Sequence, residues 1–155
     1  LESIKKFKIG AWPKNSFVAR KQLGDSILKE AKVLWYDKDE GVEVVKFQHH
    51  RLVMPMYDAN GNCVSIMGRT IYSAEKQKEL GLPKYINTGY HKRLHLFGLN
   101  LAKDSIRKTN KALVVEGNLD VIKAHQNAMF NVVCATGSSF TLEQMILLSR
   151  YNNNI

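Results

Sequence analysis

The 155-residue sequence has only two cysteines, three prolines and no long apolar run. Cys63 and Cys134 lie far apart and form no Cys-x-x-Cys pair, which excludes a structural zinc module and a disulfide framework. No apolar stretch approaches the roughly 18 residues that a membrane-spanning helix requires. The first ten residues, LESIKKFKIG, lack the apolar segment of a secretory signal. We therefore expect a cytoplasmic globular protein without zinc and without a membrane partner.

Negative charge is also scarce. The chain has 23 Lys and Arg against 14 Asp and Glu, a formal net charge of +9. The excess lies in residues 1–32 and 84–111, whereas residues 33–83 and 112–155 are slightly acidic. Clustered positive charge favours a polyanionic partner, because neutralised phosphates release their counterions. A lysine-rich surface that serves only solubility would have the same composition.

The first part of the chain has a mixed helical and extended pattern. Asn15 is typical of a cap for a helix over SFVARKQL, Gly24 ends that helix, and Asp25 is placed to cap a second one. VEVVKF, RLVMPMY and CVSIMGRTI are typical strands, and DANGN forms a turn between the last two. Pro55 predicts an edge position or a bulge for its strand. Residues 74–110 are mostly polar and basic, and within them AEKQKELGLPKYINTGYHKRL is expected to form a long, partly helical surface connection.

From Ala112 onward, apolar runs alternate with amphipathic ones. ALVVE and NVVCAT predict strands, and LDVIKAHQNAM and TLEQMILLSRY predict helices, the second with Thr141 near its cap. Such alternation indicates right-handed β-α-β units and a parallel sheet. The terminal NNNI would begin a third strand.

Two acids follow the first of these strands. Glu116 and Asp120 are the only acids between Asp104 and Glu143, and Gly117 between them would permit a tight turn. Ligands of parallel sheets gather at the carboxyl ends of the strands. Two carboxylates about 4 Å apart would repel by roughly 4 kcal/mol at an effective dielectric constant of about 20, and a bound Mg²⁺ removes that penalty. Alternatively, Asp120 only complements the helix dipole and Glu116 only ends a strand.

The motif VVEGNLDVIKAHQ resembles the signature of the Toprim fold, the catalytic module of topoisomerases and primases. Four further blocks, RLVMPMYDANGNCVSIMGR, LPKYINT, YHKRLHLFGLNLA and ATGSSFTLEQMILLSR, are similar in content and order to bacterial DnaG-type DNA primases. The resemblance spans about residues 51–150. It implies an α+β N-terminal lobe over residues 1–110, followed by the first half of an α/β Toprim lobe, a Rossmann-like parallel sheet, over residues 111–155.

The resemblance also implies roles for single residues. Glu116 would coordinate metal or assist proton transfer, and Asp120 would contribute to the same metal site, which takes Mg²⁺ or Mn²⁺. Gly137 would belong to a glycine-containing loop near the active site. Four basic residues would contact nucleotide or template phosphates: Arg51, Arg69, Lys84 and Lys92.

Three departures from the family pattern stand out. Asn118 occupies a position where primases usually have an aromatic residue, and INTGYHK is shorter than the usual segment. No acid follows Glu143, so the Asp-x-Asp pair expected at the end of a third strand is absent. We therefore expect the chain to be a piece of a larger primase, cut within the catalytic core.

The implied activity is metal-dependent nucleotidyl transfer that makes short RNA primers on single-stranded DNA during replication. Its partners would be the template, nucleoside triphosphates, the RNA primer and, through regions not present here, a replicative helicase. We expect this piece alone to catalyse little. The alternative is a non-catalytic nucleic-acid-binding module on a Toprim scaffold. Trp12, Phe17 and Trp35 could stack on bases, although core packing is the expected role.

Overall fold

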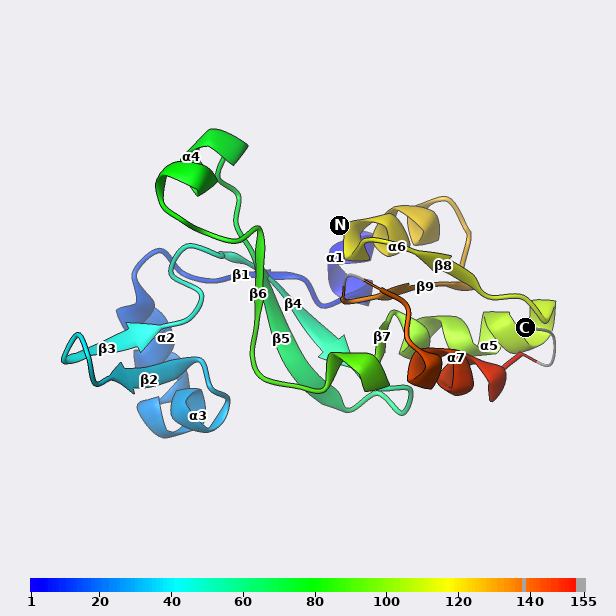
Figure 1. Ribbon diagram of the computed structural model, residues 1–155, viewed down its shortest axis with the longest axis horizontal. Coiled ribbons are helices and arrows are strands. Elements are labelled where there is room, and N and C mark those ends of the chain that lie inside the picture. Colours follow the sequence, from blue (N-terminus) through cyan, green and yellow to red (C-terminus); the bar gives the residue numbers. More distant parts are fainter. Residues whose placement is uncertain (138, 153–155) are drawn as a thin grey trace. The chain divides into compact units, whose positions relative to one another are not determined.

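A computed structural model describes residues 1–137 and 139–152 of the chain as a mixed α/β protein (Figure 1). The chain divides into two compact units. Unit 1 comprises Leu1–Phe7, Met56–Val64 and Tyr90–Ile155, and unit 2 comprises Lys8–Pro55 and Ser65–Gly89. In the described part of the chain, no helix has both the length and the apolar character needed to cross a bilayer.

Unit 2 begins with two short helices and a β-hairpin. Helix α2 (Ser16–Leu23) starts where the Asn15 side chain accepts a hydrogen bond from the Phe17 N–H, and it ends at Gly24, as predicted. Helix α3 (Asp25–Glu30) follows directly. Strands β2 (Leu34–Asp37) and β3 (Val42–Val45) pair antiparallel. The core of this unit contains Trp12, Ala19, Leu28, Val33, Leu34 and Phe47.

Asp25 does not cap α3, contrary to the sequence-based expectation, and its helix is shorter than the pattern suggested. The Asp25 carboxylate instead accepts hydrogen bonds from the Arg20 guanidinium, which also donates to Glu43. These bonds raise the pKa of Arg20 and lower the pKa of Asp25. Asp25 therefore joins α3 to α2.

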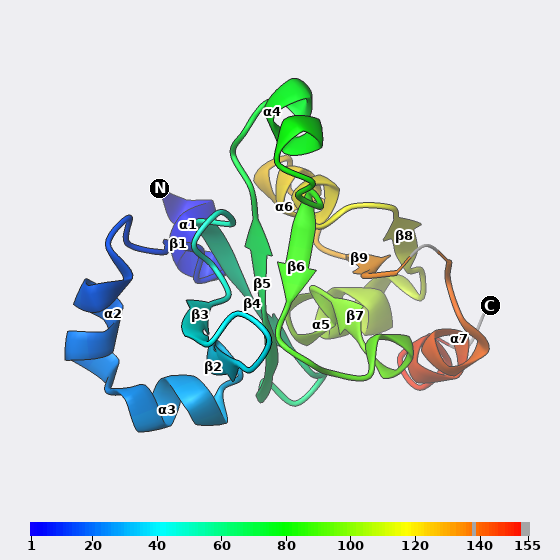
Figure 2. The ribbon, with the colours of Figure 1, turned by 60° about the vertical axis from the view of Figure 1, so that its left-hand side comes forward.

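A four-stranded sheet has the order β1 (Gly10–Ala11), β4 (Leu52–Tyr57), β5 (Cys63–Arg69) and β6 (Tyr85–Asn87), visible in Figure 2. Strand β4 lies inside this order, not at the edge that Pro55 predicted. Because β1 pairs only with Leu52 and Val53, it does not extend to Pro55. The turn at Asp58–Asn62 is confirmed: the Asp58 carboxylate accepts from the N–H groups of Asn60 and Asn62.

Gly68 in β5 shows why a glycine stands inside a strand. A Cβ atom there would lie 2.8 Å from the carbonyl oxygen of His50 and would overlap the ring of Phe47, which is fully buried. The missing side chain thus makes room for Phe47, the largest fully buried side chain of unit 2.

Unit 1 is built on a three-stranded sheet of order β7 (Leu96–Phe97), β9 (Val132–Ala135) and β8 (Leu113–Val115). Strands β8 and β9 are parallel, as predicted, with Leu113 opposite Val132 and Val115 opposite Cys134. Strand β7 is antiparallel to β9. The sheet is therefore mixed. Helix α6 (Asn118–Gln126) connects the parallel strands β8 and β9 in a β-α-β unit, and helix α7 (Leu142–Ser149) follows β9.

Residues 74–110 form both surface and core elements: residues 74–94, the expected surface connection, are exposed or half-buried apart from Thr88, and the core elements follow them. After the exposed helix α4 (Ala74–Glu79), the chain forms β6, the 3-10 turn η1 (Lys92–Leu94), β7 and helix α5 (Leu99–Thr109). Leu99, Ala102 and Ile106 of α5 are buried in the core with Leu96, Val133 and Leu148. Their spacing places them on one helix face. By contacts, α5 and β7 cluster with the residues after 111, whereas the family boundary at residue 110 stays a prediction.

Helix α7 begins as the sequence predicted. The Thr141 side chain accepts from the Gln144 N–H, and the Gln144 side chain accepts from the Thr141 N–H, a complete capping box. The third strand expected over NNNI falls mainly on residues 153–155, outside the described residues.

Candidate metal and nucleic-acid sites

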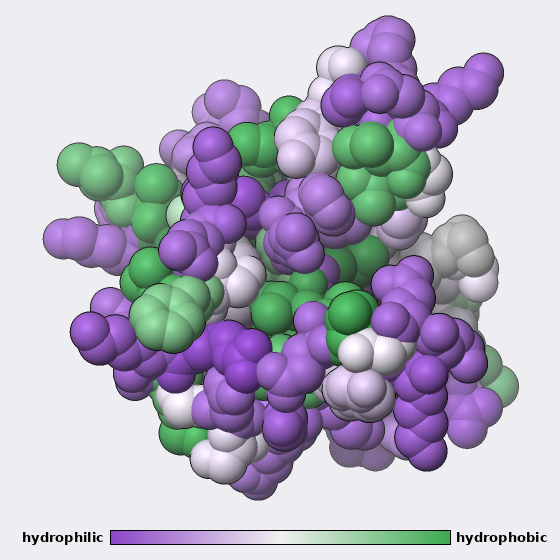
Figure 3. Space-filling view, turned by 90° about the vertical axis from the view of Figure 1, so that its left-hand side faces the viewer, coloured by the Kyte–Doolittle hydropathy of each residue, from purple (hydrophilic) through white to green (hydrophobic). Residues whose placement is uncertain are grey.

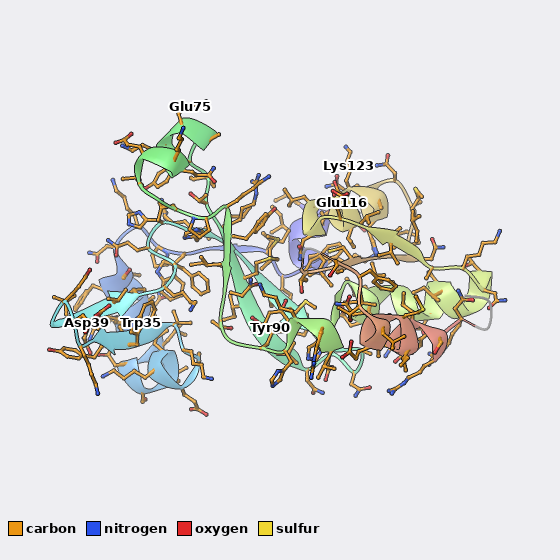
Figure 4. All side chains as sticks on the ribbon, in the orientation of Figure 1. Trp35, Asp39, Glu75, Tyr90, Glu116 and Lys123 are labelled. Atoms are coloured by element: carbon orange, nitrogen blue, oxygen red, sulfur yellow. The ribbon has the colours of Figure 1, made fainter. Side chains whose placement is uncertain are left out.

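Glu116 lies where β8 ends and α6 begins, at the carboxyl edge of the parallel strands (Figure 4). It borders a hollow of about 490 Å³ whose other lining residues come from β8, from the end of β9 and from the segment after β9: Val114, Val115, Ala135, Gly137, Ser139 and Phe140. Gly137 therefore lines the same hollow as Glu116. This is the edge at which parallel sheets bind ligands.

Asp120 lies in the first turn of α6 and folds back toward Gly117. Its Oδ2 atom is 2.7 Å from the position that a Cβ atom on Gly117 would occupy. The backbone of Gly117 is extended, with φ −120° and ψ 148°. The backbone conformation therefore does not require glycine for the turn that the sequence suggested, and the absent side chain leaves room for the Asp120 carboxylate, which would have to move if a Cβ atom were present.

Asp120 also acts on its neighbour Cys134, which is fully buried in β9. Burial, and secondarily the Asp120 charge, raise the pKa of the Cys134 thiol to about 12. The thiol stays protonated at neutral pH and is a packing residue rather than a nucleophile or a metal ligand.

Both carboxylates are exposed, and neither forms a hydrogen bond or an ion pair with another described residue. Two free carboxylates suit Mg²⁺ or Mn²⁺, which takes its remaining ligands from water and phosphate. Within residues 1–137 and 139–152, no group of three His, Cys, Asp or Glu side chains could hold a metal ion. The donor set therefore fits part of a divalent-cation site.

Asn118, between the two acids, is buried, and its Nδ2 atom has no hydrogen-bond partner in the described part of the chain. This is the position where the family resemblance led us to expect an aromatic side chain. An unpaired buried amide lowers the free energy of unfolding, so the first turn of α6, beside the two acids, contains an unsatisfied polar group.

Three of the four predicted phosphate-binding residues belong to unit 2. Arg51 is half-buried, and its Nε donates to the Trp12 carbonyl oxygen at 2.9 Å while the Trp12 N–H donates back to the Arg51 carbonyl. Arg69 in β5 is directly opposite Tyr85 in β6, and Lys84 precedes Tyr85. Among the described residues, neither Arg69 nor Lys84 forms an ion pair.

The fourth, Lys92, is an exposed residue of η1 in unit 1. Its carbonyl oxygen accepts a hydrogen bond from Gln144 Nε2, which also donates to the carbonyl of His95. Gln144 is almost fully buried. Gln144 therefore positions Lys92. The sequence analysis did not identify this role, although the T-x-x-Q pattern of a capping box is present in the sequence.

The aromatic residues differ from expectation. Trp12 is buried, as expected, but Phe17 is 66% exposed and Trp35 is 39% exposed, so core packing was the wrong interpretation for both. Lys46 lies over the Trp35 ring. On the face shown in Figure 3, apolar surface is interspersed with hydrophilic side chains.

Comparisons with known proteins agree with the mixed α/β fold described above. Residues 1–103 match the family described as DNA primase catalytic core, N-terminal domain. The DNA primase of Enterococcus faecalis is 34% identical over 157 residues, which cover 96% of this chain and 25% of the relative. The chain thus spans about a quarter of the length of this curated relative.

Solved structures of primases are also similar to this chain. The crystal structure of the Aquifex aeolicus primase, comprising its zinc-binding and RNA polymerase domains, is similar with a TM-score of 0.80 and 29% identity over 97% of this chain and 37% of that one. A DnaG primase catalytic domain bound to single-stranded DNA gives a TM-score of 0.78 and 30% identity over 99% of this chain and 49% of that one.

Proposed function

Since the chain belongs to the bacterial DnaG-type DNA primases, we propose that it is part of a primase catalytic core that synthesises short RNA primers on single-stranded DNA. In this proposal residues 1–110 form the N-terminal subdomain and residues 111–155 the first half of a Toprim lobe. The protein acts in the cytoplasm during replication and reaches a replicative helicase through other regions.

The observation that supports the proposal is the pair of carboxylates at the carboxyl ends of the parallel strands β8 and β9, which have no hydrogen-bond or ion-pair partner among the described residues, with Glu116 bordering an open hollow. Glu116 and Asp120 would hold a divalent cation, Mg²⁺ or Mn²⁺, which when bound neutralises charge developing on the phosphates. Glu116 is also placed to accept the proton of an attacking primer 3′-hydroxyl.

The basic residues have the complementary role. Arg51, Arg69, Lys84 and Lys92 bind the phosphates of template and nucleotide and orient them without reading base identity. Arg69 and Lys84 suit this role because no acidic side chain of the described residues neutralises them. Arg51 contributes its remaining guanidinium nitrogens, since its Nε is engaged by Trp12.

The test is primer synthesis by the full-length protein that carries this sequence. Glu116→Gln and Asp120→Asn should each reduce the rate roughly 100-fold or more, the scale expected when one group that stabilises transition-state charge is lost. Glu143→Gln is the matched control in the same unit, because among the described residues Glu143 has a single exposed ion pair, with Arg93 at 3.7 Å, and its rate should stay within about twofold. A wild-type rate in Glu116→Gln would contradict the proposal.

The second candidate is a non-catalytic nucleic-acid-binding module. The observation that favours it is that the described residues provide two metal-binding acids and no third ligand. It predicts that the full-length protein binds single-stranded DNA but makes no primer at any Mg²⁺ or Mn²⁺ concentration. For the 155-residue chain alone, both candidates predict binding without synthesis.

A further inference from the structure

Tyr85 in β6 carries two cations on its ring. The guanidinium carbon of Arg69 lies 5.7 Å from the ring centroid, and the Lys84 Nζ lies 6.0 Å from it. These distances are within the range in which the negative face of an aromatic ring attracts a cation. No other ring in the described residues has two cations placed on it.

The strand pairing fixes the position of Arg69 beside Tyr85, whereas Lys84, the residue before Tyr85, reaches the ring through its long side chain. Arg69 and Tyr85 are directly opposite each other in the antiparallel β5–β6 pair, so their side chains leave the sheet on the same face. The Thr70 N–H donates to the Lys84 carbonyl at 3.1 Å, which continues the pairing to Lys84. Strand β6 is at the edge of its sheet, where a ligand can approach.

Neither cation has an acidic partner in the part of the chain that the structure describes. Arg69 Nε is buried and has no hydrogen-bond partner within residues 1–137 and 139–152. Arg20 in the same unit is the opposite case, because Asp25 and Glu43 neutralise it. Two unneutralised cations near one ring repel each other, and the negative face of that ring offsets part of the repulsion.

We propose that Tyr85 is a positioning residue that holds Arg69 and Lys84 together as a binding site for the phosphates of a single nucleic-acid strand. The inference rests on the proposed function, since it assigns how one part of that binding surface is organised. Tyr85 acts through the electrostatic attraction of its ring. Its hydroxyl forms no hydrogen bond to any described residue, so Tyr85→Phe leaves no protein group unpaired.

The experiment measures binding of the 155-residue chain and of the full-length protein to a fluorescein-labelled oligothymidylate at several salt concentrations. Tyr85→Leu should weaken binding about tenfold and make the slope of log K against log salt shallower by about 0.7 to 1.4, the loss of one or two phosphate contacts. Tyr85→Phe should stay within about twofold. Tyr36→Leu is the matched control, because Tyr36 is an exposed tyrosine of unit 2 with no cation placed on its ring.

A double-mutant comparison tests the mechanism. Lys84→Gln alone should weaken binding severalfold, but in the Tyr85→Leu background it should cost much less, because Lys84 is no longer held in place. Lys76→Gln is the matched control for Lys84, since Lys76 is an exposed lysine of unit 2 that is paired with Glu79. Its effect should be small in both backgrounds.

Replacing Tyr85 with 3,4,5-trifluorophenylalanine keeps the ring shape and weakens its negative face, so it separates attraction from packing even if Tyr85→Leu fails to fold. We expect intermediate loss of affinity. Wild-type affinity in the fluorinated protein, or equal losses in Tyr85→Phe and Tyr85→Leu, would overturn this inference alone. Failure of the wild-type full-length protein to bind single-stranded DNA would instead overturn the proposed function.

Discussion

His125 in α6 is a buried histidine whose two ring nitrogens lack a hydrogen-bond partner in the described part of the chain. The rings of Phe7 and Phe130 contact it edge to face, and Lys6 lies over Phe130. Burial, and secondarily the Lys6 charge, lower the pKa of His125 to about 4. The side chain is therefore neutral and acts as an apolar ring that joins Phe7, the residue after helix α1 (Glu2–Lys6), to α6.

This environment predicts acid sensitivity. Between pH 6.5 and 4 the unfolded chain binds a proton at His125 and the folded chain does not, so the free energy of unfolding falls as the pH is lowered, by up to about 3 kcal/mol. Urea unfolding of wild type and His125→Leu at pH 7 and 4.5 measures this, and the variant should lose less stability on acidification. His91→Leu, at an exposed position, should behave like wild type. Equal acid sensitivity in wild type and His125→Leu would contradict the assignment.

Gly117 gives a prediction for the acidic site. A Cβ atom in Gly117→Ala would meet Asp120 Oδ2 at 2.7 Å, so the carboxylate must move. We expect Mn²⁺ binding to the full-length protein, followed by electron paramagnetic resonance, to weaken about tenfold, roughly 1.4 kcal/mol. Gly89→Ala is the control, because its added methyl group would have no neighbour closer than 3.9 Å. Unchanged Mn²⁺ affinity in Gly117→Ala would show that Asp120 is not a ligand.

At the scale of elements, η1 and α7 are joined through one side chain. Gln144 hydrogen-bonds to the carbonyls of Lys92 and His95 and to the N–H of Thr141, while the Thr141 hydroxyl donates to the Arg93 carbonyl. A 3-10 turn of three residues has little stability of its own. Its position, and with it that of Lys92, therefore depends on α7.

Gln144→Leu keeps a side chain of similar size and removes these bonds; the Lys92 carbonyl still accepts from the His95 N–H, but the Thr141 N–H and the His95 carbonyl lose the bonds that Gln144 makes to them. We expect a loss of about 2–4 kcal/mol in the free energy of unfolding, measured in urea. Hydrogen exchange should show faster exchange in unit 1 and an unchanged rate in unit 2. The neighbouring Glu143→Gln, at an exposed position, should cost under about 0.5 kcal/mol. A similar small cost for Gln144→Leu would mean that α7 does not hold η1.

The sequence predicted elements whose signals are local. The cap at Asn15, the turn at Asp58, the capping residue Thr141 and the parallel β-α-β unit follow from neighbouring residues, and all are present. Sequence patterns did not predict the features that depend on a contact with another helix or strand. The Asp25 carboxylate forms an ion pair with Arg20, whose guanidinium also binds Glu43, instead of capping α3. Strand β7 has only two residues and is formed by its pairing with β9.

The candidate site shows the same limit. The sequence pattern predicted that Glu116 follows a parallel strand and that Asp120 lies in the next helical turn. Strand β8 ends just before Glu116, and Asp120 is in the first turn of α6. The close approach at Gly117, the buried amide of Asn118 and the cation-binding ring of Tyr85 depend on side-chain packing. No spacing in the sequence encodes them.

For the whole molecule, the net charge of +9 sets how binding responds to salt. If about four phosphates of a single strand are neutralised, log K should fall with log salt with a slope of about −2.8. Affinity for an oligothymidylate should then drop roughly 50-fold between 50 and 200 mM salt, measured by fluorescence anisotropy. A slope near zero would remove the electrostatic basis of the proposed function.

Unit 1 is assembled from three separate stretches of chain, and unit 2 supplies both of the stretches between them. The backbone therefore passes from one unit to the other four times. Neither unit corresponds to one uninterrupted piece of the gene, so recombination at a single crossover could not transfer one without the other. The two should be inherited as a pair and should have diverged together.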